Sequence, residues 1–395
     1  MLVGIVGKAN VGKSTFFKAL TLSDVEIADY PFTTIKPNQG VGFVRIKCPC
    51  QDFHVKCTPN NSVCLMGNRF LPISLLDVAG LVPGAHEGRG LGNKFLDDLS
   101  SADVLLNVVD ASGTTDEEGR KTTGYDPIKE VGFLREELNF WFFKLVSEIY
   151  FDAVKLNRIN SKNKFIEKIA EKLSGLKVNI NQVKFACKEV GLDFENPSLD
   201  SEVIKKFSFK LREISKPILI SCNKIDMPSS KENILKIKSE FPDLIIVPCS
   251  AQYELALRMA DKNNLIEYIP GDSDFKITGN LNEKQKEALF NIQKFIKENN
   301  GTGVQECLNK AVFDVLSMKT AFPVEDENKL TNNKGAVLPD GFLLEKNATV
   351  LDFAEKVHSA MAKNFIRAVD CRTKKIIGRD YVVKDRDVLT IKFNG

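Results

Sequence analysis

Short runs of apolar residues recur along the chain, and each is followed by polar or glycine-rich residues. Such runs occupy residues 2–6, 70–76, 217–222 and 244–249, and a further one ends at Asp110. Continuous apolar runs of this length are typical of strands that are buried on both faces of a parallel sheet. After the first run, residues 15–20 open a helix. The pattern therefore predicts an α/β domain in which strands alternate with helices.

The pattern changes between residues 128 and 212 to long amphipathic stretches rich in Lys, Glu and Asn. Residues 134–145 and 165–173 have apolar residues at helical spacing. We interpret this region as an antiparallel helical arm inserted between two strands of the α/β domain. The aromatic residues 141–143 could offer a surface to a partner, but we expect them in the core of the arm. We expect the lysines on a solvated face rather than in an RNA-binding patch.

The last quarter of the chain has a strand pattern of its own. Residues 285–316 give two helical stretches, and residues 323–329 are expected to be a linker. Strands are then expected at residues 336–344, as a hairpin that turns at Pro-Asp-Gly, and at residues 381–383 and 388–391. Between them lies a helix over residues 349–358, with Thr349 as its N-cap and Asp352 at the capping-box position. These elements predict a second, small α+β domain.

The chain has 395 residues, which is more than one typical domain holds. Its 43% hydrophobic and 27% charged residues are ordinary for a globular protein, and its net charge of +3 neither favours nor excludes nucleic acid. The sequence has no signal peptide pattern and no membrane-spanning run, so we expect a cytoplasmic protein that binds no membrane. We place the two parts of the α/β domain at 1–127 and 213–322, the helical arm at 128–212 and the C-terminal domain at 323–395.

The candidate chemistry begins directly after the first strand. Residues 7–14 read Gly-Lys-Ala-Asn-Val-Gly-Lys-Ser and match G-x-x-x-x-G-K-[ST], the phosphate-binding P-loop. The glycines let the backbone pass close to phosphate oxygens, and the N-terminus of the following helix favours an anion. We expect Lys13 to reach the β- and γ-phosphates and Ser14 to bind Mg²⁺. The residues expected to bind nucleotide here are Gly7, Asn10, Val11, Gly12, Lys13, Ser14 and Thr15.

Two further segments extend the phosphate and Mg²⁺ site. Asp77 ends an apolar strand and starts the sequence Asp-Val-Ala-Gly, so its carboxylate can hold Mg²⁺, often through water, and the N–H of Gly80 can approach the γ-phosphate. Residues 30–38 lie between the P-loop helix and this strand, and we expect a loop there that orders with the triphosphate. Thr34 is the Mg²⁺ ligand that we expect from this loop; the alternative is a proline-bounded connector.

Base recognition is expected at the ends of two later strands. Residues 223–226 read Asn-Lys-Ile-Asp, and the two carboxylate oxygens of Asp226 match the N1–H and 2-amino groups of guanine, a donor pair that adenine lacks. Asn223 is expected to hold the loop, and the stem of Lys224 to pack on the purine face. After the following strand, a backbone N–H at Ser250 or Ala251 could reach O6 of guanine.

Residues 77–93 read Asp-Val-Ala-Gly-Leu-Val-Pro-Gly-Ala-His-Glu-Gly-Arg-Gly-Leu-Gly-Asn. Together with residues 30–38 they closely resemble the Obg-like translation-factor GTPases, and the details resemble the YchF branch in its archaeal form. The resemblance implies a ribosome- or translation-associated switch with an inserted α-helical arm in its P-loop GTPase domain. The C-terminal elements resemble a TGS domain, a small α+β module of the β-grasp type. Bacterial and eukaryotic YchF members have a degenerate base-recognition motif and favour ATP, whereas this chain keeps residues 223–226, so we predict GTP.

Leu81 follows Gly80 at the position where Ras-type enzymes carry a glutamine that positions water. Because a leucine cannot orient water, we expect slow turnover or dependence on another group or a partner. His86, in the glycine-rich segment that follows, is one candidate for orienting water, and a solvent-exposed loop histidine is the alternative. The expected catalytic residues are therefore Lys13, Gly80 and His86.

Two other groups of residues have candidate chemistry. Basic residues in the C-terminal domain could contact ribosomal RNA phosphates, although Asp370 and Asp380 lie among them: Arg367, Arg372, Lys374, Lys375 and Arg379. Thiolates that lie close together in the sequence, with His54 among them, could form a tetrahedral zinc site: Cys48, Cys50, Cys57 and Cys64. The cysteine spacing is irregular for such a site, so free thiols or a pair of disulfides remain alternatives.

These motifs predict a Mg²⁺-dependent GTPase that acts with a ribosome or ribosomal RNA and with no DNA. One alternative is an ATPase of the YchF type. The other is a nucleotide-gated RNA- or ribosome-binding module whose hydrolysis is incidental, an alternative that Leu81 leaves open. A metabolic kinase would need an acceptor-substrate motif, which the sequence lacks.

Overall fold

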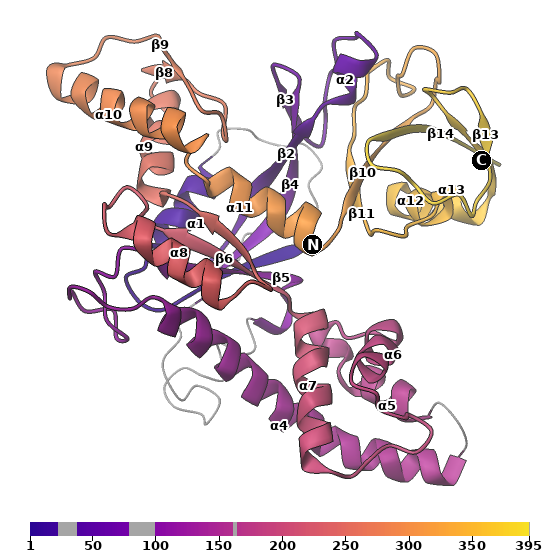
Figure 1. The fold of residues 1–395 in the computed structure, drawn as a ribbon. Helices are drawn as coiled ribbons and strands as arrows, with labels where there is room; N and C mark the ends of the chain where they lie inside the picture. The colour runs from indigo at the N-terminus through magenta and orange to yellow at the C-terminus, as the bar shows by residue number, and fades with distance from the viewer. Residues whose placement is uncertain (23–37, 79–98, 161–163, 395) are drawn as a thin grey trace. The chain divides into compact units, whose positions relative to one another are not determined.

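The computed structural model describes residues 1–22, 38–78, 99–160 and 164–394 (Figure 1). The chain divides into two compact units. Unit 1 comprises Met1–Ala19, Leu75–Leu255 and Thr302–Cys307, and unit 2 comprises Leu20–Ser74, Ala256–Gly301 and Leu308–Gly395. Among the described residues, no helix is both long and apolar enough to cross a membrane.

A seven-stranded sheet provides the framework of the nucleotide-binding motifs. In spatial order its strands are β2 (Gln39–Lys47), β4 (Asn68–Asp77), β1 (Leu2–Val6), β5 (Val104–Asp110), β6 (Ile218–Asn223) and β7 (Ile245–Pro248), with β3 (Val63–Leu65) beside β4. Strands β1, β5, β6 and β7 are parallel neighbours. Every residue of β5 and β6 is buried, as expected for strands covered on both faces. The predicted α/β class is therefore confirmed.

The register of these strands brings the sequence motifs to one edge. Asp110, the last residue of β5, lies opposite Asn223, the last residue of β6. The P-loop follows β1 and leads into α1 (Lys13–Thr21), while α8 (Ser230–Glu240) and α9 (Ala251–Lys262) follow β6 and β7. Because parallel strands end at the same edge, the segments that follow them meet at the carboxyl edge, where α/β sheets bind ligands.

The region between β5 and β6 is helical (Figure 1). Its elements are α4 (Ile128–Asn160), α5 (Lys164–Lys172), a 3₁₀ turn (Ser174–Leu176), α6 (Ile180–Glu189) and α7 (Ser201–Ser215). The ring of Tyr150 lies 5.0 Å from that of Phe165 and 6.0 Å from that of Phe207, and its hydroxyl donates to the carbonyl oxygen of Ser198. Trp141 and Phe142 are buried in the same hydrophobic core, as expected, and Phe143 packs against it while partly exposed.

Unit 2 contains several further elements. These are α2 (Pro49–Asp52), the two-stranded sheet of β8 (Ile266–Glu267) and β9 (Lys276–Ile277), α10 (Glu283–Asn299), and α11 (Val304–Lys310), which begins in unit 1 and continues into a π-helical turn (Ala311–Val315). A capping box between Asn282 and Gln285 starts α10. The two helical stretches expected over residues 285–316 are therefore present.

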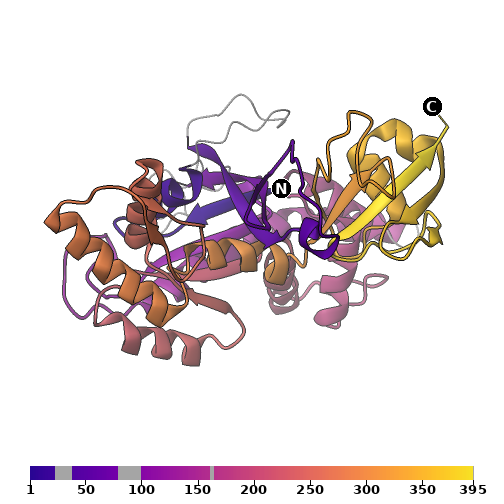
Figure 2. The ribbon, with the colours of Figure 1, turned by 90° about the horizontal axis from the view of Figure 1, so that it is seen from above.

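The C-terminal part of unit 2 is a small sheet with two short helices (Figures 1 and 2). In spatial order its strands are β11 (Phe342–Leu344), β10 (Lys319–Val324), β14 (Asp387–Phe393), β12 (Phe365–Asp370) and β13 (Ile376–Ile377). Only β10 and β14 pair in parallel, and α12 (Val350–Val357) and α13 (Ser359–Lys363) complete the module. The expected capping box at the start of α12 is present, because Thr349 and Asp352 hydrogen-bond to each other through backbone and side chain. The expected α+β fold of this module is confirmed.

Three sequence expectations for this module are wrong. Pro323 and Val324, assigned to a linker, lie in β10. Residues 336–344 form no hairpin, because β11 pairs with β10 while the carbonyl of Val337 accepts from the amide of Thr58. Residues 381–383 form only an isolated bridge, between Val382 and Thr349. In each case a partner distant in sequence, rather than the local residue pattern, decides whether a strand forms.

An ionic contact in unit 2 joins the segment after β2 to the C-terminal sheet. The carboxylate of Asp52 pairs with Arg372 at 2.9 Å and also with Arg386. Burial alone would raise the pKa of Asp52, but the hydrogen bond from Arg372 and the charge of Arg386 outweigh it and lower the pKa. The ionised carboxylate therefore favours the folded state.

We expect Asp52→Asn to lower the free energy of unfolding at pH 7 by about 1 kcal/mol, because it removes two partly exposed ion pairs. Since the folded pKa is lowered, the contribution is present above the unfolded value of 3.8 and is lost as the pH falls through the folded value. Denaturant unfolding of both proteins at a series of pH values measures this, with Asp380→Asn as an exposed control. A stability difference that does not shrink at low pH would contradict the assignment.

Candidate functional site

The P-loop turns sharply between β1 and α1. Gly7 (φ +143°) and Gly12 (φ +99°) have backbone conformations that L side chains rarely adopt. A Cβ at Gly7 would lie 2.4 Å from the carbonyl oxygen of Val108, and one at Gly12 would lie 2.4 Å from Nδ2 of Asn223. Both positions therefore require glycine, for backbone conformation and for close approach.

Lys13, Ser14 and Asp77 meet where β4 ends and α1 begins. The hydroxyl of Ser14 donates to Oδ2 of Asp77 at 3.3 Å. Neighbouring oxygen ligands of an octahedral Mg²⁺ ion lie about 2.9 Å apart, for Mg–O distances of about 2.05 Å, so these two oxygens could both serve one ion, directly or through water. The residues present therefore fit Mg²⁺.

The charge of Lys13 lies beside this oxygen pair. Its ammonium donates to the carbonyl oxygen of Lys8 at 2.6 Å. Burial lowers the pKa of Lys13 and raises the pKa of Asp77, and the attraction between the two charges opposes both shifts. A half-buried cation next to P-loop amides can stabilise phosphate oxygens strongly, because water screens it little.

Asn223 joins two loops at the carboxyl edge. Its side-chain amide donates to the carbonyl oxygen of Val11 at 2.8 Å, and its Oδ1 accepts from the backbone N–H of Ala251 at 2.9 Å. The hydroxyl of Ser250 donates to Oδ1 of Asp226 at 2.6 Å. The P-loop, the segment after β6 and the segment after β7 are thus fixed to one another, and the carboxylate of Asp226 is oriented.

Lys224 is held by an acid that the sequence analysis treated only as a strand end. Its ammonium pairs with Oδ2 of the fully buried Asp110 at 2.7 Å. Burial alone would raise the pKa of Asp110, but hydrogen bonds from Lys224 and neighbouring hydroxyls outweigh it and lower the pKa. The available signal was an aspartate at the carboxyl end of a buried strand, followed by hydroxyl residues at 112, 114 and 115.

A second buried pair supports the P-loop and was also missed. The ammonium of Lys8 lies 2.6 Å from Oε1 of Glu130, donates to the carbonyl oxygens of Thr115 and Asp116, and sits 4.1 Å from the centre of the Tyr125 ring. Burial raises the pKa of Glu130 to about 7, although the charge of Lys8 opposes this. The P-loop motif allows any residue at position 8, so it gave no indication that Lys8 forms this buried ion pair.

Residues of the P-loop and of the segments after β6 and β7 line one pocket of about 500 Å³, a usual size for a small-molecule site, whereas Lys8 and Glu130 line a separate pocket. The predicted residues that line it are Asn10, Gly12, Lys13, Ser14, Thr15, Asn223, Lys224 and Asp226. Thr114, Met227 and Gln252 line it too and were not predicted. Val11 and Ala251 contribute backbone groups to the bonds of Asn223 rather than pocket surface. Three further predicted residues lie outside the described part of the chain: Thr34, Gly80 and His86.

We expect Gly12→Ala to weaken nucleotide binding at least about tenfold and to lower the free energy of unfolding by about 1–3 kcal/mol. The new Cβ would displace Asn223, which holds Val11 and Ala251. Titration calorimetry and denaturant unfolding measure the two effects. Gly132→Ala is the matched control, since a Cβ there meets no atom within 4 Å. Unchanged nucleotide affinity in Gly12→Ala would contradict the close packing described above.

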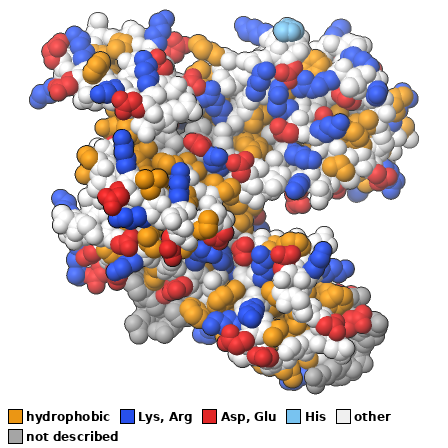
Figure 3. Space-filling model, in the orientation of Figure 1, with side chains coloured by type: hydrophobic (Ala, Val, Ile, Leu, Met, Phe, Trp, Pro, Cys, Tyr) orange, Lys and Arg blue, Asp and Glu red, His pale blue; other side chains and the backbone are white. Residues whose placement is uncertain are grey.

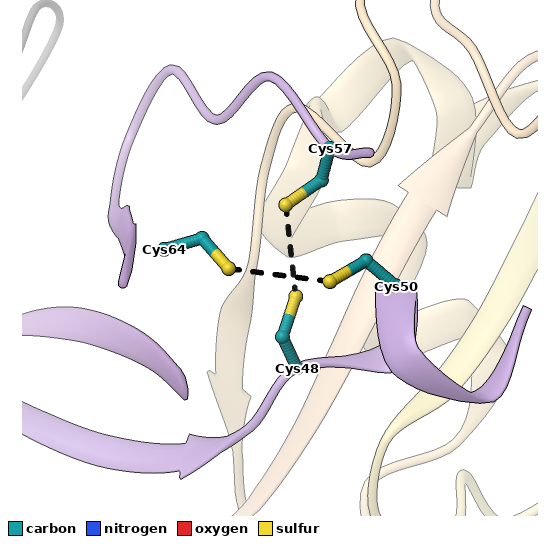
Figure 4. A group of neighbouring side chains, drawn as sticks. All are labelled: Cys48, Cys50, Cys57 and Cys64. Atoms are coloured by element: carbon teal, nitrogen blue, oxygen red, sulfur yellow. Dashed lines mark hydrogen bonds between the residues drawn. The ribbon is translucent and has the colours of Figure 1, made fainter. Parts of the chain in front are cut away.

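A separate group of side chains in unit 2 could hold a metal ion (Figure 4). The sulfur atoms of Cys48, Cys50, Cys57 and Cys64 all lie within 4.8 Å of one another. All four cysteines are free, and the sulfurs of Cys48 and Cys57 lie 3.9 Å apart and those of Cys50 and Cys64 4.0 Å apart, about twice the S–S bond length. The two disulfides considered from the sequence are therefore not formed. His54 is exposed and not part of the group.

Three family models match the chain. Residues 2–134 match the model described as 50S ribosome-binding GTPase, and residues 221–326 match the one described as Obg-like GTPase YGR210-like, G4 motif-containing domain. Residues 334–393 match the TGS domain. The matched ranges include the P-loop, the base-recognition motif and the C-terminal sheet.

Whole-chain relatives agree with these matches. A GTP-binding protein of Methanocaldococcus jannaschii is 44% identical over 99% of this chain and 98% of its own length. A GTP-binding protein of Schizosaccharomyces pombe is 35% identical over 93% of this chain and 92% of its own length. The Ribosome-binding ATPase YchF of Buchnera aphidicola is 27% identical over 99% of this chain and 98% of its own length. The crystal structure of a GTP binding protein from Pyrococcus horikoshii superposes with a TM-score of 0.81, at 34% identity and full coverage of both chains. The chain therefore belongs to the Obg-like P-loop GTPases of the YchF type and carries a C-terminal TGS domain.

Proposed function

We propose that this protein binds GTP with Mg²⁺ in the pocket at the carboxyl edge of the seven-stranded sheet and hydrolyses it to GDP and phosphate. The observation that carries the proposal is that one pocket is lined both by a phosphate-binding group, Lys13 with Ser14, and by a guanine-selective group, Asp226. A site for phosphate alone would not need an oriented carboxylate at the base position.

The phosphate end of the pocket would stabilise the charge that develops during hydrolysis. Lys13 would place its ammonium between the β- and γ-phosphates, and P-loop amides would bind their oxygens. Ser14 would bind Mg²⁺ and Asp77 would support the ion, consistent with the 3.3 Å between their oxygens. Bound Mg²⁺ neutralises phosphate charge in such sites. The protein would then catalyse hydrolysis by positioning the triphosphate and by stabilising its negative charge.

Three residues complete this proposal from the segments that the structure does not describe. Thr34 would supply a second hydroxyl to Mg²⁺, and the amide of Gly80 would bind the γ-phosphate. His86 would orient the attacking water, a role that Leu81 cannot perform because its side chain has no polar atom. We therefore expect slow turnover in the isolated protein, and faster turnover with a partner that adds a polar group.

Guanine selectivity is the second element of the proposal. Asp226 would accept from N1–H and the 2-amino group of guanine, and a backbone N–H at Ser250 or Ala251 would donate to O6. In support, Ser250 orients the carboxylate of Asp226, and the matched family model is described by its G4 motif. The relative from Buchnera aphidicola is named an ATPase, so an ATP-hydrolysing enzyme is the competing assignment.

Phosphate release from GTP and from ATP, each with and without Mg²⁺, tests the proposed activity. We expect slow release from GTP that requires Mg²⁺, and release from ATP that is slower still at equal concentration. Faster release from ATP would contradict the GTPase assignment in favour of the ATPase. Binding without any hydrolysis would favour the nucleotide-gated binding module.

We also propose that the protein associates with the ribosome in its GTP-bound state, which would place it in the cytoplasm. Support comes from the family model described as 50S ribosome-binding GTPase and from the name of the relative in Buchnera aphidicola. Contact through RNA phosphates has weaker support. Arg372 is engaged with Asp52, and Lys and Arg are interspersed with Asp and Glu on the visible face of the C-terminal module (Figure 3).

Co-sedimentation with ribosomes tests this association. We expect the protein to sediment with ribosomes in the presence of a non-hydrolysable GTP analogue and to remain in the supernatant with GDP. If RNA phosphates contribute, Arg367→Ala combined with Lys375→Ala should lower the bound fraction and its dependence on salt. Failure to sediment in either nucleotide state would contradict the proposal.

A further inference from the structure

The four cysteines lie in the part of the chain that connects β2 to β4. Cys48 directly follows β2, Cys50 lies in α2, Cys57 lies in a loop and Cys64 lies in β3. Figure 4 shows the four side chains converging from these separate elements on one point. Between α2 and β3 the chain has no regular secondary structure, so backbone pairing alone does not fix its path.

The sulfur positions match a tetrahedral metal site. With Zn–S distances of about 2.3 Å, the sulfurs of a zinc tetrahedron lie about 3.8 Å apart. The measured separations are 3.9 Å for Cys48–Cys57 and 4.0 Å for Cys50–Cys64, and no pair exceeds 4.8 Å. Two independent disulfides would need close contact only within each pair, whereas all four sulfurs here are mutual neighbours.

The surroundings provide the charge that such a centre needs. Four thiolates around Zn²⁺ have a net charge of −2, which is costly to bury without a cation nearby. Arg69 is fully buried and lies directly opposite Cys64 in the β3–β4 ladder, on the same face of the sheet. Its Nη2 donates to the carbonyl oxygen of Leu338, while its Nε and Nη1 have no hydrogen-bond partner among the described residues. The single positive charge of Arg69 can offset part of the −2 charge of the centre.

The cysteine group also belongs to the core of the C-terminal module. Cys48 and Cys50 are buried in one hydrophobic cluster with Phe322, Leu338 and Val388. Backbone hydrogen bonds connect the same two parts, from the amide of Thr58 to Val337 at 2.9 Å and from the amide of Asn60 to Pro339 at 2.7 Å. The cysteine segment, residues 48–64, is therefore the surface on which residues 336–341 are held.

We propose that Cys48, Cys50, Cys57 and Cys64 bind one structural Zn²⁺ ion, and that this ion holds the cysteine segment in the shape that fixes residues 336–341 of the C-terminal module. All four ligand positions are protein sulfurs, so the site is closed, as in structural zinc sites. The ion would fix the path of residues 53–62, which have no regular secondary structure, and its loss would release both sides of the contact. The four cysteines belong to unit 2 and the residues of the nucleotide pocket to unit 1, so the two sites share no residue.

Metal analysis of the full chain, purified without chelator, tests the site. We expect one zinc per chain in the wild type and in Cys187→Ala, whose buried thiol lies on α6 outside the cluster, and much less zinc in Cys64→Ser. Because Cys64→Ser could fail to fold, the wild type is also loaded with Co²⁺, whose absorption spectrum reports tetrahedral thiolate ligation. Zinc far below one per chain together with no such spectrum overturns the site, and stoichiometric iron overturns the choice of metal.

Hydrogen exchange before and after removal of zinc with a strong chelator tests the proposed role. We expect exchange at the amides of Thr58, Asn60 and Gly341 to become at least tenfold faster, since these amides donate across the contact. Amides of β5 in unit 1 should exchange as before. Bound zinc whose removal leaves the exchange of these three amides unchanged overturns the structural role. Nucleotide affinity is measured in parallel, so that failure of the GTPase proposal is separable from failure of this one.

Discussion

Lys13→Ala is expected to reduce the rate of GTP hydrolysis by about 10³-fold or more, the scale seen when a charge that stabilises a phosphoryl-transfer transition state is removed. In the structure the ammonium of Lys13 is half-buried beside Asp77. Burial lowers the pKa of Lys13, and the charges of Asp77 and Glu130 oppose this shift. Alanine removes the charge and leaves the carboxylate of Asp77 without its cation.

Phosphate release under saturating GTP measures this effect separately from affinity. Lys18→Ala is the matched control, since Lys18 is an exposed lysine on the same helix and should hydrolyse GTP as the wild type does. If Lys13→Ala binds GTP and hydrolyses it within a few-fold of the wild-type rate, the phosphate site lies elsewhere. Circular dichroism of the variant excludes unfolding as the cause of a loss.

Asp226→Asn is expected to weaken GTP binding by about 10²-fold or more, because a site built to accept two hydrogen bonds from guanine then presents an amide donor to guanine donors. The carboxylate is oriented by Ser250, so the substitution changes its chemistry with little change of shape. Xanthosine triphosphate has a carbonyl in place of the 2-amino group. The introduced side-chain amide can donate to that carbonyl, so binding should be rescued.

Calorimetry with non-hydrolysable analogues of the guanine and xanthine nucleotides measures the affinity of the wild type and of Asp226→Asn for each base. Rescue by the xanthine nucleotide shows that the variant is folded and that residue 226 contacts the base. Asp152→Asn, at an exposed position of α4 in the arm, is the control and should bind as the wild type does. A variant of Asp226 that keeps the wild-type affinity for GTP would contradict its role in base recognition.

The parts of the pocket that the sequence predicted are those whose function needs a particular residue type at a fixed local spacing. Gly12, Lys13 and Ser14 belong to a strand-loop-helix motif, and Asp226 follows a buried strand, so periodicity and spacing placed them at the carboxyl edge. The apolar runs likewise gave the strands of the sheet, because strands that are buried on both faces require them.

The residues that were missed act through partners far away in the chain. Lys8 pairs with Glu130, and Lys224 pairs with Asp110, over separations of more than 100 residues. The position of Asp110 after a buried strand indicated a residue at the carboxyl edge, but no local pattern identified either charged partner. The wrong hairpin at residues 336–344 has the same origin, because residues 58–61 provide its hydrogen-bond partners.

The cysteine group lies between these cases. The sequence supplied four ligands of the right type, but their irregular spacing did not indicate that they meet. They converge because β3 turns back beside β4, which brings Cys64 opposite Arg69 and close to the end of β2. The sequence therefore identifies the candidate ligands, whereas their geometry depends on the fold that brings them together.

Titration calorimetry of the wild-type protein with non-hydrolysable GTP and ATP analogues, each with Mg²⁺, decides whether the pocket selects guanine. We predict that the guanine nucleotide binds at least about 10²-fold more tightly, since only guanine offers Asp226 two donors. Equal or tighter binding of the ATP analogue would contradict the account and assign the protein to the ATP-hydrolysing members of its family, despite the intact sequence at residues 223–226.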